Sequence, residues 1–356
     1  MQSNSKKVRH LLDLQGLGDL KLFKADLSED GSFEEAISGC DFVFHVATPV
    51  DFQSQDPEVF GLGLSGLFFH SRRTPGLIHD QNDMIKPSIN GVLNILKSCA
   101  KVKTVKRVVY TSSIAAVQRN ELTGTDLVLD EDNWCDVEYI TSKKPFGWGY
   151  AVSKTLAEKM AFEFAKENNL DVISITPVVI VGESITQEVP HSVIVALSLL
   201  TGKNSQLNPS TAIPFAPPSH SSKLYAQSLM DDCMHAGDAG KDIDWLKSLQ
   251  LLSGVLSVVH VIDVCRAHIF AAENESCSGR YICSAFDTTV PELAKFLAQR
   301  YPQYDVPTSF DDLPAKPTVR MSSEKLIKAG FTYNYGIEEI YDDGVKYFKA
   351  VGLLAK

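Results

Sequence analysis

The sequence predicts an α/β fold built on a doubly wound parallel sheet, with a smaller C-terminal lobe. Up to residue 182, short runs rich in β-branched and aromatic residues alternate with longer amphipathic runs. The run VISITPVVIVG at 172–182 is about half as long as a membrane-spanning helix, so we expect a buried strand there. After residue 200 the pattern becomes more mixed. This order of elements is typical of a parallel sheet with helices on both faces.

Each expected element follows from its local composition. The helical runs carry apolar stripes, as Ile89, Val92, Leu93 and Leu96 do within 88–101. A serine is expected to cap the short helix SFEEAISG. We expect strands at 21–27, 41–47, 107–113 and 172–182, and helices at 32–39, 88–101 and 149–168.

The C-terminal part is expected to form a lobe over the carboxyl ends of the sheet, where ligands bind in such folds. It contains one strand-like run, 279–285, and three helical runs, 291–301, 322–330 and 337–352. We therefore predict a nucleotide-binding part at 1–185 and a mostly substrate-binding lobe at 186–356, with some segments returning to the first part. Two stretches without periodicity, 59–81 and about 205–244, are expected to be insertions.

Composition excludes several classes of function. The net charge of −10 argues against nucleic-acid binding, which needs a concentrated cationic surface. No apolar run reaches the length of a membrane span, and the first residues lack the apolar core of a signal peptide. The seven cysteines form no C-x-x-C pair, which favours free thiols and a cytoplasmic location. We expect no metal site, since even His260 and His268 lack the spacing of metal ligands.

Tyr150 and Lys154 stand four residues apart at the start of an expected helix, within GWGYAVSKTLAEK. This spacing places both side chains on one face. A nearby ammonium lowers the pKa of a phenol, so the pair can act as an acid or base. Ser113, which ends the preceding strand, could hold a substrate oxygen. The alternative is a surface pair, because many helices carry this spacing by chance.

Longer motifs resemble those of the extended short-chain dehydrogenase/reductases, and within them the plant flavonoid reductases. They include GCDFVFHVATPVDF, NDMIKPSINGVLNILKSCA, VKRVVYTSS, WGYAVSKTLAEK and HVIDVCRAHIF. LTGTDLVLDEDNW and ITQEVPHSVIVALSLLTG favour the anthocyanidin reductases over the dihydroflavonol reductases. The resemblance implies a Rossmann-like fold and NADPH-dependent reduction of a flavonoid, from anthocyanidin to flavan-3-ol. Dihydroflavonol reductase-like activity, another carbonyl substrate such as a nucleotide sugar, and an impaired variant that binds cofactor poorly are the alternatives.

The resemblance also implies roles for individual residues. Ser113, Tyr150 and Lys154 match the catalytic serine, tyrosine and lysine of the family, and Gln118 falls where relatives contact the flavonoid. Lys7 matches a lysine near the 2′-phosphate, which points to NADPH, although it could be a solvated helix residue. The other positions that match cofactor contacts are Asp26, Leu27, Val46, Ala47, Thr48, Pro177, Val178, Val179, Ile180 and Ser192.

The chain departs from the family pattern at its start. The family opens with a strand and a glycine-rich turn that approaches the cofactor pyrophosphate. The first motif here, KKVRHLLDL, belongs after that turn, so we expect the first βαβ unit to be missing. GLGLSG at 61–66 fits the spacing G-x-G-x-x-G, but neither a strand precedes it nor a convincing helix follows, so we do not expect a phosphate loop there.

Overall fold

The structure is a computed structural model. It describes residues 5–48, 85–118, 127–145, 147–186, 189–201, 239–311, 313 and 318–355. The predicted insertion at 59–81, with its GLGLSG run, lies outside the described residues, and so does most of the one at 205–244.

A four-stranded parallel sheet forms the centre of the described chain, in the order β1-β2-β4-β7. Its strands are β1 (Phe42–His45), β2 (Arg107–Thr111), β4 (Val172–Pro177) and β7 (Gly279–Cys283). All four lie within runs that the sequence predicts as strands, and the predicted α/β class is confirmed. Because the strands are parallel, their carboxyl ends meet at one edge of the sheet.

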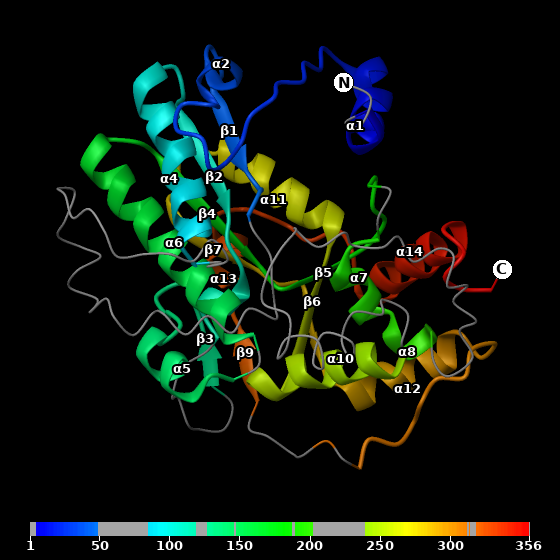
Figure 1. The fold of residues 1–356 in the computed structure, drawn as a ribbon. Helices are drawn as coiled ribbons and strands as arrows, with labels where there is room; N and C mark the ends of the chain where they lie inside the picture. Colours follow the sequence, from blue (N-terminus) through cyan, green and yellow to red (C-terminus); the bar gives the residue numbers. More distant parts are fainter. Residues whose placement is uncertain are drawn as a thin grey trace, which may run out of the picture.

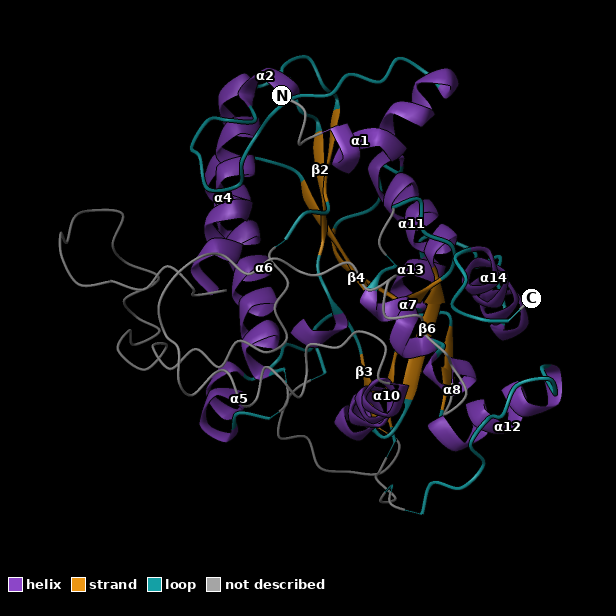
Figure 2. Cartoon of the chain, turned by 45° about the vertical axis from the view of Figure 1, so that its right-hand side comes forward, coloured by secondary structure: helices purple, strands orange, loops and turns teal. Residues whose placement is uncertain are grey.

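Helices cover both faces of this sheet, as Figures 1 and 2 show. Helices α4 (Ile85–Val102) and α6 (Trp148–Asn168) pack on one face, and α11 (Val261–Glu273) and α13 (Glu324–Lys328) pack on the other. Alternate residues of β2 follow this division. Val108 and Tyr110 pack in the core under α4 and α6, whereas Val109 packs toward α11. Because alternate residues face the two cores, positions 108 to 110 of β2 are all buried hydrophobic residues.

Two local predictions near the start are wrong. Residues 21–27 are not a strand, and no strand in the described ranges pairs with them. Ser32 does not cap α2 (Glu34–Ile37); its hydroxyl instead exchanges hydrogen bonds with the backbone of Asp26. A strand needs a partner for its backbone groups, and here local bonds take that place. The preceding residues form α1 (Ser5–Leu12) and the 3₁₀-helix η1 (Asp13–Leu17).

The apolar run 172–182 forms two strands rather than one. After β4 the chain changes sheets at Val178 and continues as β5 (Val179–Val181). Strand β5 pairs with β6 (Leu256–His260), which pairs in turn with β8 (Phe286–Thr288). Both strands are apolar, so composition alone shows no break between them.

The remaining elements form the C-terminal lobe and its connections. Around β5, β6 and β8 pack α7 (His191–Ala196), α8 (Ser198–Thr201), α10 (Ala239–Ser253), α12 (Val290–Arg300) and α14 (Ile337–Ala350), as Figure 1 shows. The 3₁₀-helix η3 (Ile114–Ala116) and α5 (Val137–Lys143) precede α6, and β3 (Leu127–Leu129) pairs with β9 (Val319–Met321). The boundary between residues 185 and 186 stays a prediction.

Arg107 joins the sheet to α11 from a nearly buried position. It forms a salt bridge with Asp171 at 2.8 Å, just before β4. Its guanidinium also donates to the carbonyl oxygens of Ala271 and Asn274, both at 2.7 Å, and of Cys277 at 3.3 Å. The Ala271 and Asn274 carbonyls lie at the end of α11, where a cation is favoured by the helix dipole.

Replacing Arg107 with methionine is expected to lower the free energy of unfolding by about 2–3 kcal/mol, because buried carbonyls lose their donors. Denaturant titration measures the change. Lys106→Met is the matched control, since the Lys106 side chain forms an exposed ion pair with Asp41. Equal stability of the two variants would contradict this role for Arg107.

Candidate active site

The segments predicted to hold a cofactor and a substrate meet at the carboxyl edge of the central sheet. Residues 46–48 follow β1, Ser112 and Ser113 follow β2, and Val178 follows β4. The parallel register aligns these ends, with His45 opposite Tyr110 and Thr111 opposite Ile175. This edge is where open α/β sheets bind ligands.

Ser113 leaves β2 in an extended conformation and caps η3. Its hydroxyl oxygen accepts a hydrogen bond from the Ala115 backbone amide at 3.2 Å. Helix η3 packs against α6, which brings the segment after Ser113 beside the helix that carries Tyr150. Gln118 follows this turn, and its backbone amide donates to the carbonyl of Ile114. Ser113 and Gln118 are both half-buried.

Helix α6 starts immediately after Gly147, which has a positive φ of 65° that favours glycine. Trp148 is buried at the first helical position, so it packs in the core. Tyr150 is half-buried against the same core, one turn before Lys154. Lys154 is only 2% exposed, and its Nζ donates to the Thr111 carbonyl at 2.9 Å. The lysine is therefore held by the strand end that continues into Ser113.

Burial controls the charge of Lys154. Loss of solvent lowers the pKa of its ammonium to about 8, against a smaller opposing effect of Glu158. The Nζ lies 5.2 Å from the centre of the Tyr110 ring. Because the pKa lies near neutrality, small changes of environment change the charge of this lysine.

His45, the last residue of β1, lies on the same side as Lys154. It is 3% exposed, and its ring centre is 5.3 Å from that of Tyr110. Burial, together with the charge of Lys154, lowers the pKa of His45 to about 4, so the imidazole is neutral at pH 7. Burial also raises the pKa of Tyr110. Sequence reasoning assigned no role to either residue; a polar ring at the end of a buried strand is the signal that could have pointed to them.

The predicted cofactor residues lie in several places. Asp26 is exposed, and its carboxylate accepts from the amide and hydroxyl of Ser28 at 2.8 and 2.7 Å. These bonds lower the pKa of Asp26. Leu27 contacts Gly91 and accepts through its carbonyl from Asn94. Lys7 lies in α1, with its side chain outside the described part. Val46 and Ala47 are exposed, Thr48 is half-buried, Pro177 ends β4, Val179 and Ile180 are in β5, and Ser192 is in α7.

This edge fits the nicotinamide end of a dinucleotide better than its phosphates. Lys154 has three N–H donors, of which the Thr111 carbonyl takes one, so donors remain for ribose hydroxyls. Asp26 presents an exposed, ionised acceptor in the segment before α2. Among the turns that follow β1, β2 and β4, none of the described residues next to the strand is a glycine. The described residues thus provide no glycine-rich phosphate cradle at these strand ends.

His268 and Asp263, in the segment 260–268, have structural partners. His268 donates through Nδ1 to the Val264 carbonyl at 2.8 Å, so its Nε2 accepts from the Thr111 hydroxyl at 2.7 Å. The buried Asp263 carboxylate accepts from Arg266 and from the backbone amides of Asn334 and Tyr335. Within the ranges that the structure describes, no group of three or more His, Cys, Asp or Glu could hold a metal ion.

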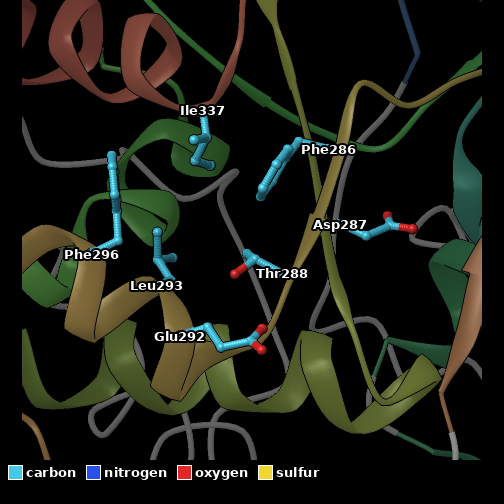
Figure 3. Close-up of a pocket in the computed structure, with 7 residues that line it drawn as sticks. All are labelled: Phe286, Asp287, Thr288, Glu292, Leu293, Phe296 and Ile337. Carbon is cyan, nitrogen blue, oxygen red and sulfur yellow. The ribbon is translucent and has the colours of Figure 1, made fainter.

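A separate cavity of about 340 Å³ lies in the C-terminal lobe. Figure 3 shows that Phe286, Leu293, Phe296 and Ile337 surround it, with Thr288 and Glu292 at its polar end. Asp287 points to the other side of β8, where it accepts from Ser257. None of the predicted catalytic or cofactor residues lines this cavity, so it is distinct from the edge described above.

Comparison with known proteins decides the family. The chain is 52% identical over 351 residues to the anthocyanidin reductase ((2S)-flavan-3-ol-forming) of Vitis vinifera, over 99% of the chain and 86% of that protein. The chain belongs to the extended short-chain dehydrogenases/reductases, in the anthocyanidin reductase group. It is also 41% identical to the dihydroflavonol 4-reductase of Callistephus chinensis, over 98% of the chain and 78% of that protein.

Other comparisons agree with this extended short-chain dehydrogenase/reductase assignment. The NAD-binding family model described as "Male sterility protein" matches residues 66–212. The crystal structure of vestitone reductase from alfalfa superposes with a TM-score of 0.69 at 33% identity, covering 98% of this chain and 88% of that one. The family resemblance predicted from the motifs is confirmed, and the chain is an oxidoreductase of a nicotinamide-dependent family. No helix in the described ranges is long and apolar enough to span a membrane.

The buried neutral state of His45 predicts a loss of stability in acid. Its pKa is about 4 in the folded protein and about 6.5 when unfolded. The unfolded state therefore binds the extra proton between these values, and the free energy of unfolding falls as pH drops through this window. In the wild-type protein this effect lowers the free energy of unfolding by up to about 3 kcal/mol between pH 7 and pH 4, and His45→Asn should remove it. Denaturant titrations of both proteins across this pH range measure the difference. Parallel profiles for the two proteins would show that His45 does not titrate in this way.

Proposed function

We propose that this chain reduces an anthocyanidin to a flavan-3-ol with NADPH as the hydride donor. One structural observation carries the proposal: Lys154, buried on α6 one turn after Tyr150, is bonded to the strand end that continues into Ser113. Identity of 52% to the grape anthocyanidin reductase supports this choice of substrate.

An anthocyanidin is a flavylium cation, and its conversion to a flavan-3-ol takes two hydrides and one proton. Two successive NADPH molecules would supply the hydrides, and the protein would supply the proton and the orientation. Tyr150 would donate its phenolic proton to the substrate. Lys154 would lower the pKa of that phenol through its charge and hold the ribose hydroxyls. Ser113 would donate to a substrate oxygen, and Gln118 would contact the flavonoid ring system. The backbone of Val46, Ala47 and Thr48, with the turn from Pro177 to Ile180 and Ser192, would line the cofactor.

NADPH is proposed over NADH because of Lys7, whose ammonium would pair with the 2′-phosphate; Asp26 and Leu27 would contact the adenosine. A cytoplasmic location is proposed from the cysteines. All six that the structure describes are free thiols, as expected in a reducing compartment. Fluorescence titration with NADPH and NADH tests the cofactor choice, and stronger binding of NADH would refute it.

A dihydroflavonol is the second candidate substrate, favoured by the 41% identity to dihydroflavonol 4-reductase. Both reactions use the same hydride and proton donors, so the edge of the sheet does not separate them. A panel with an anthocyanidin and a dihydroflavonol, followed by NADPH consumption and product chromatography, decides between them.

Replacing Tyr150 with phenylalanine is expected to lower kcat by about 100-fold or more while NADPH still binds, because only the proton donor is removed. Stopped-flow or steady-state NADPH consumption measures kcat. Tyr139→Phe is the matched control, because Tyr139 packs against the same core from α5. Unchanged turnover in Tyr150→Phe would refute the role assigned to this phenol.

Activity is expected to fall above about pH 8. As pH rises through the pKa of Lys154, the lysine loses its charge and no longer lowers the pKa of the Tyr150 phenol. The pH profile of kcat/KM for NADPH reports groups of the free enzyme, so kcat/KM should decrease above about pH 8. In Lys154→Arg the residual activity should not decrease above pH 8, because arginine keeps its charge. A wild-type profile that is flat to pH 9.5 would contradict the prediction.

A further inference from the structure

A buried carboxylate lies directly beneath the candidate catalytic residues. Glu158 is on α6, one turn after Lys154, and it is 0% exposed. A glutamate in a helix interior is normally solvated, and burial of its charge is costly without partners. Its complete burial therefore calls for a specific arrangement of donors.

Four hydrogen bonds satisfy the Glu158 carboxylate. Ser112 donates to Oε2 at 2.7 Å, and Ser174 donates to Oε1. Arg280 donates through Nε to Oε1 at 2.9 Å and through Nη2 to Oε2 at 3.1 Å, a bidentate pair. These donors come from the segment after β2, from β4 and from β7, so one side chain of α6 connects to three neighbouring strands.

Arg280 is itself fixed on its far side. Its guanidinium lies 3.7 Å from the centre of the Trp134 ring and donates to the Asn133 carbonyl at 2.8 Å. Arg280 is also nearly buried. The carboxylate is thus held by a partner whose own position is fixed by stacking and hydrogen bonding.

The hydrogen bond from Ser112 connects the Glu158 network to the candidate catalytic residues. Ser112 lies between Thr111, whose carbonyl holds Lys154, and Ser113, the candidate that orients the substrate. We propose that Glu158 is a positioning residue: its carboxylate ties the Thr111–Ser113 segment to α6 and so sets Ser113 relative to Tyr150 and Lys154. This inference rests on the proposed function for its catalytic consequence.

The geometry predicts an unequal response to two similar changes. Ser112→Ala and Ser174→Ala each remove one hydroxyl donor from the same buried carboxylate. Of these two serines, only Ser112 is adjacent in sequence to Ser113 and to Thr111, which holds Lys154. Small displacements of catalytic groups reduce rates strongly, so Ser112→Ala should lower kcat about tenfold, and at least about fivefold more than Ser174→Ala does.

The decisive measurement compares the loss of kcat in Ser112→Ala with the loss in Ser174→Ala, provided that the two variants have similar stability. We expect similar decreases of Tm in the two serine variants and little change in KM for NADPH, while kcat separates them. Glu167→Gln, an exposed glutamate on the same helix, is the control that leaves all three unchanged. Equal kcat losses in Ser112→Ala and Ser174→Ala would reduce Glu158 to a structural role and overturn the proposal.

A second measurement does not depend on turnover. Trace labelling of amines across pH, read by mass spectrometry on the peptide that contains Lys154, gives the midpoint of its titration. The titratable groups near this amine are Tyr110, His45 and Glu158, with Arg280 behind the carboxylate. Tyr150 lies one turn earlier on α6 and acts on Tyr110. Glu158 favours the charged amine, so Glu158→Gln should move the midpoint to lower pH, while Glu167→Gln should not.

The two measurements separate the possible failures. An unchanged midpoint in Glu158→Gln shows that the carboxylate does not act on Lys154, which contradicts the proposed position of Glu158 beneath the catalytic residues. If Glu158→Gln does not fold, the two serine variants still decide. If the wild-type chain consumes no NADPH with any flavonoid, the proposed function fails, and the labelling midpoint alone decides whether Glu158 acts on Lys154.

Discussion

The hydrogen bond from the Lys154 ammonium to the Thr111 carbonyl is the interaction on which the geometry of the candidate site depends. It joins the helix that carries Tyr150 to the strand end that carries Ser113. An almost fully buried ammonium is unfavourable without such an acceptor and without a nearby negative charge. The lowered pKa of Lys154 is the direct result of this balance, because burial outweighs the favourable effect of Glu158.

Several polar groups around this bond are set in one protonation state by burial. His45 is kept neutral, and His268 uses one ring nitrogen for the Val264 carbonyl and the other for the Thr111 hydroxyl. Thr111 is therefore held from two sides, by His268 through its hydroxyl and by Lys154 through its carbonyl. The paired groups of Thr111, His268 and Lys154 favour one arrangement of these side chains, because a shift would leave a buried polar group unpaired.

The sequence predicts the regular elements of this site better than its buried partners. The strands at 41–47 and 107–113 follow from strand-like composition, and the helix at 149–168 follows from its apolar stripe. The structure places β1, β2 and α6 within or next to those ranges. The predicted strand at 21–27 is absent because pairing, rather than composition, decides whether a short run becomes a strand. The burial of Glu158 was not predictable, since its donors Ser112, Ser174 and Arg280 are brought together only by the fold.

The change of sheet at Val178 has a mechanical consequence for the site. Its backbone amide donates to the Cys283 carbonyl at 3.2 Å and closes the central sheet, and the next residue already pairs with β6. Likewise, β7 ends at Cys283, and β8 begins at Phe286 in the other sheet. The two sheets are therefore linked twice by very short connections, which restrict how far the C-terminal lobe can rotate against the cofactor edge. Both connections lie at the carboxyl edge, so any movement that brings a substrate toward Tyr150 must act through elements other than these strands.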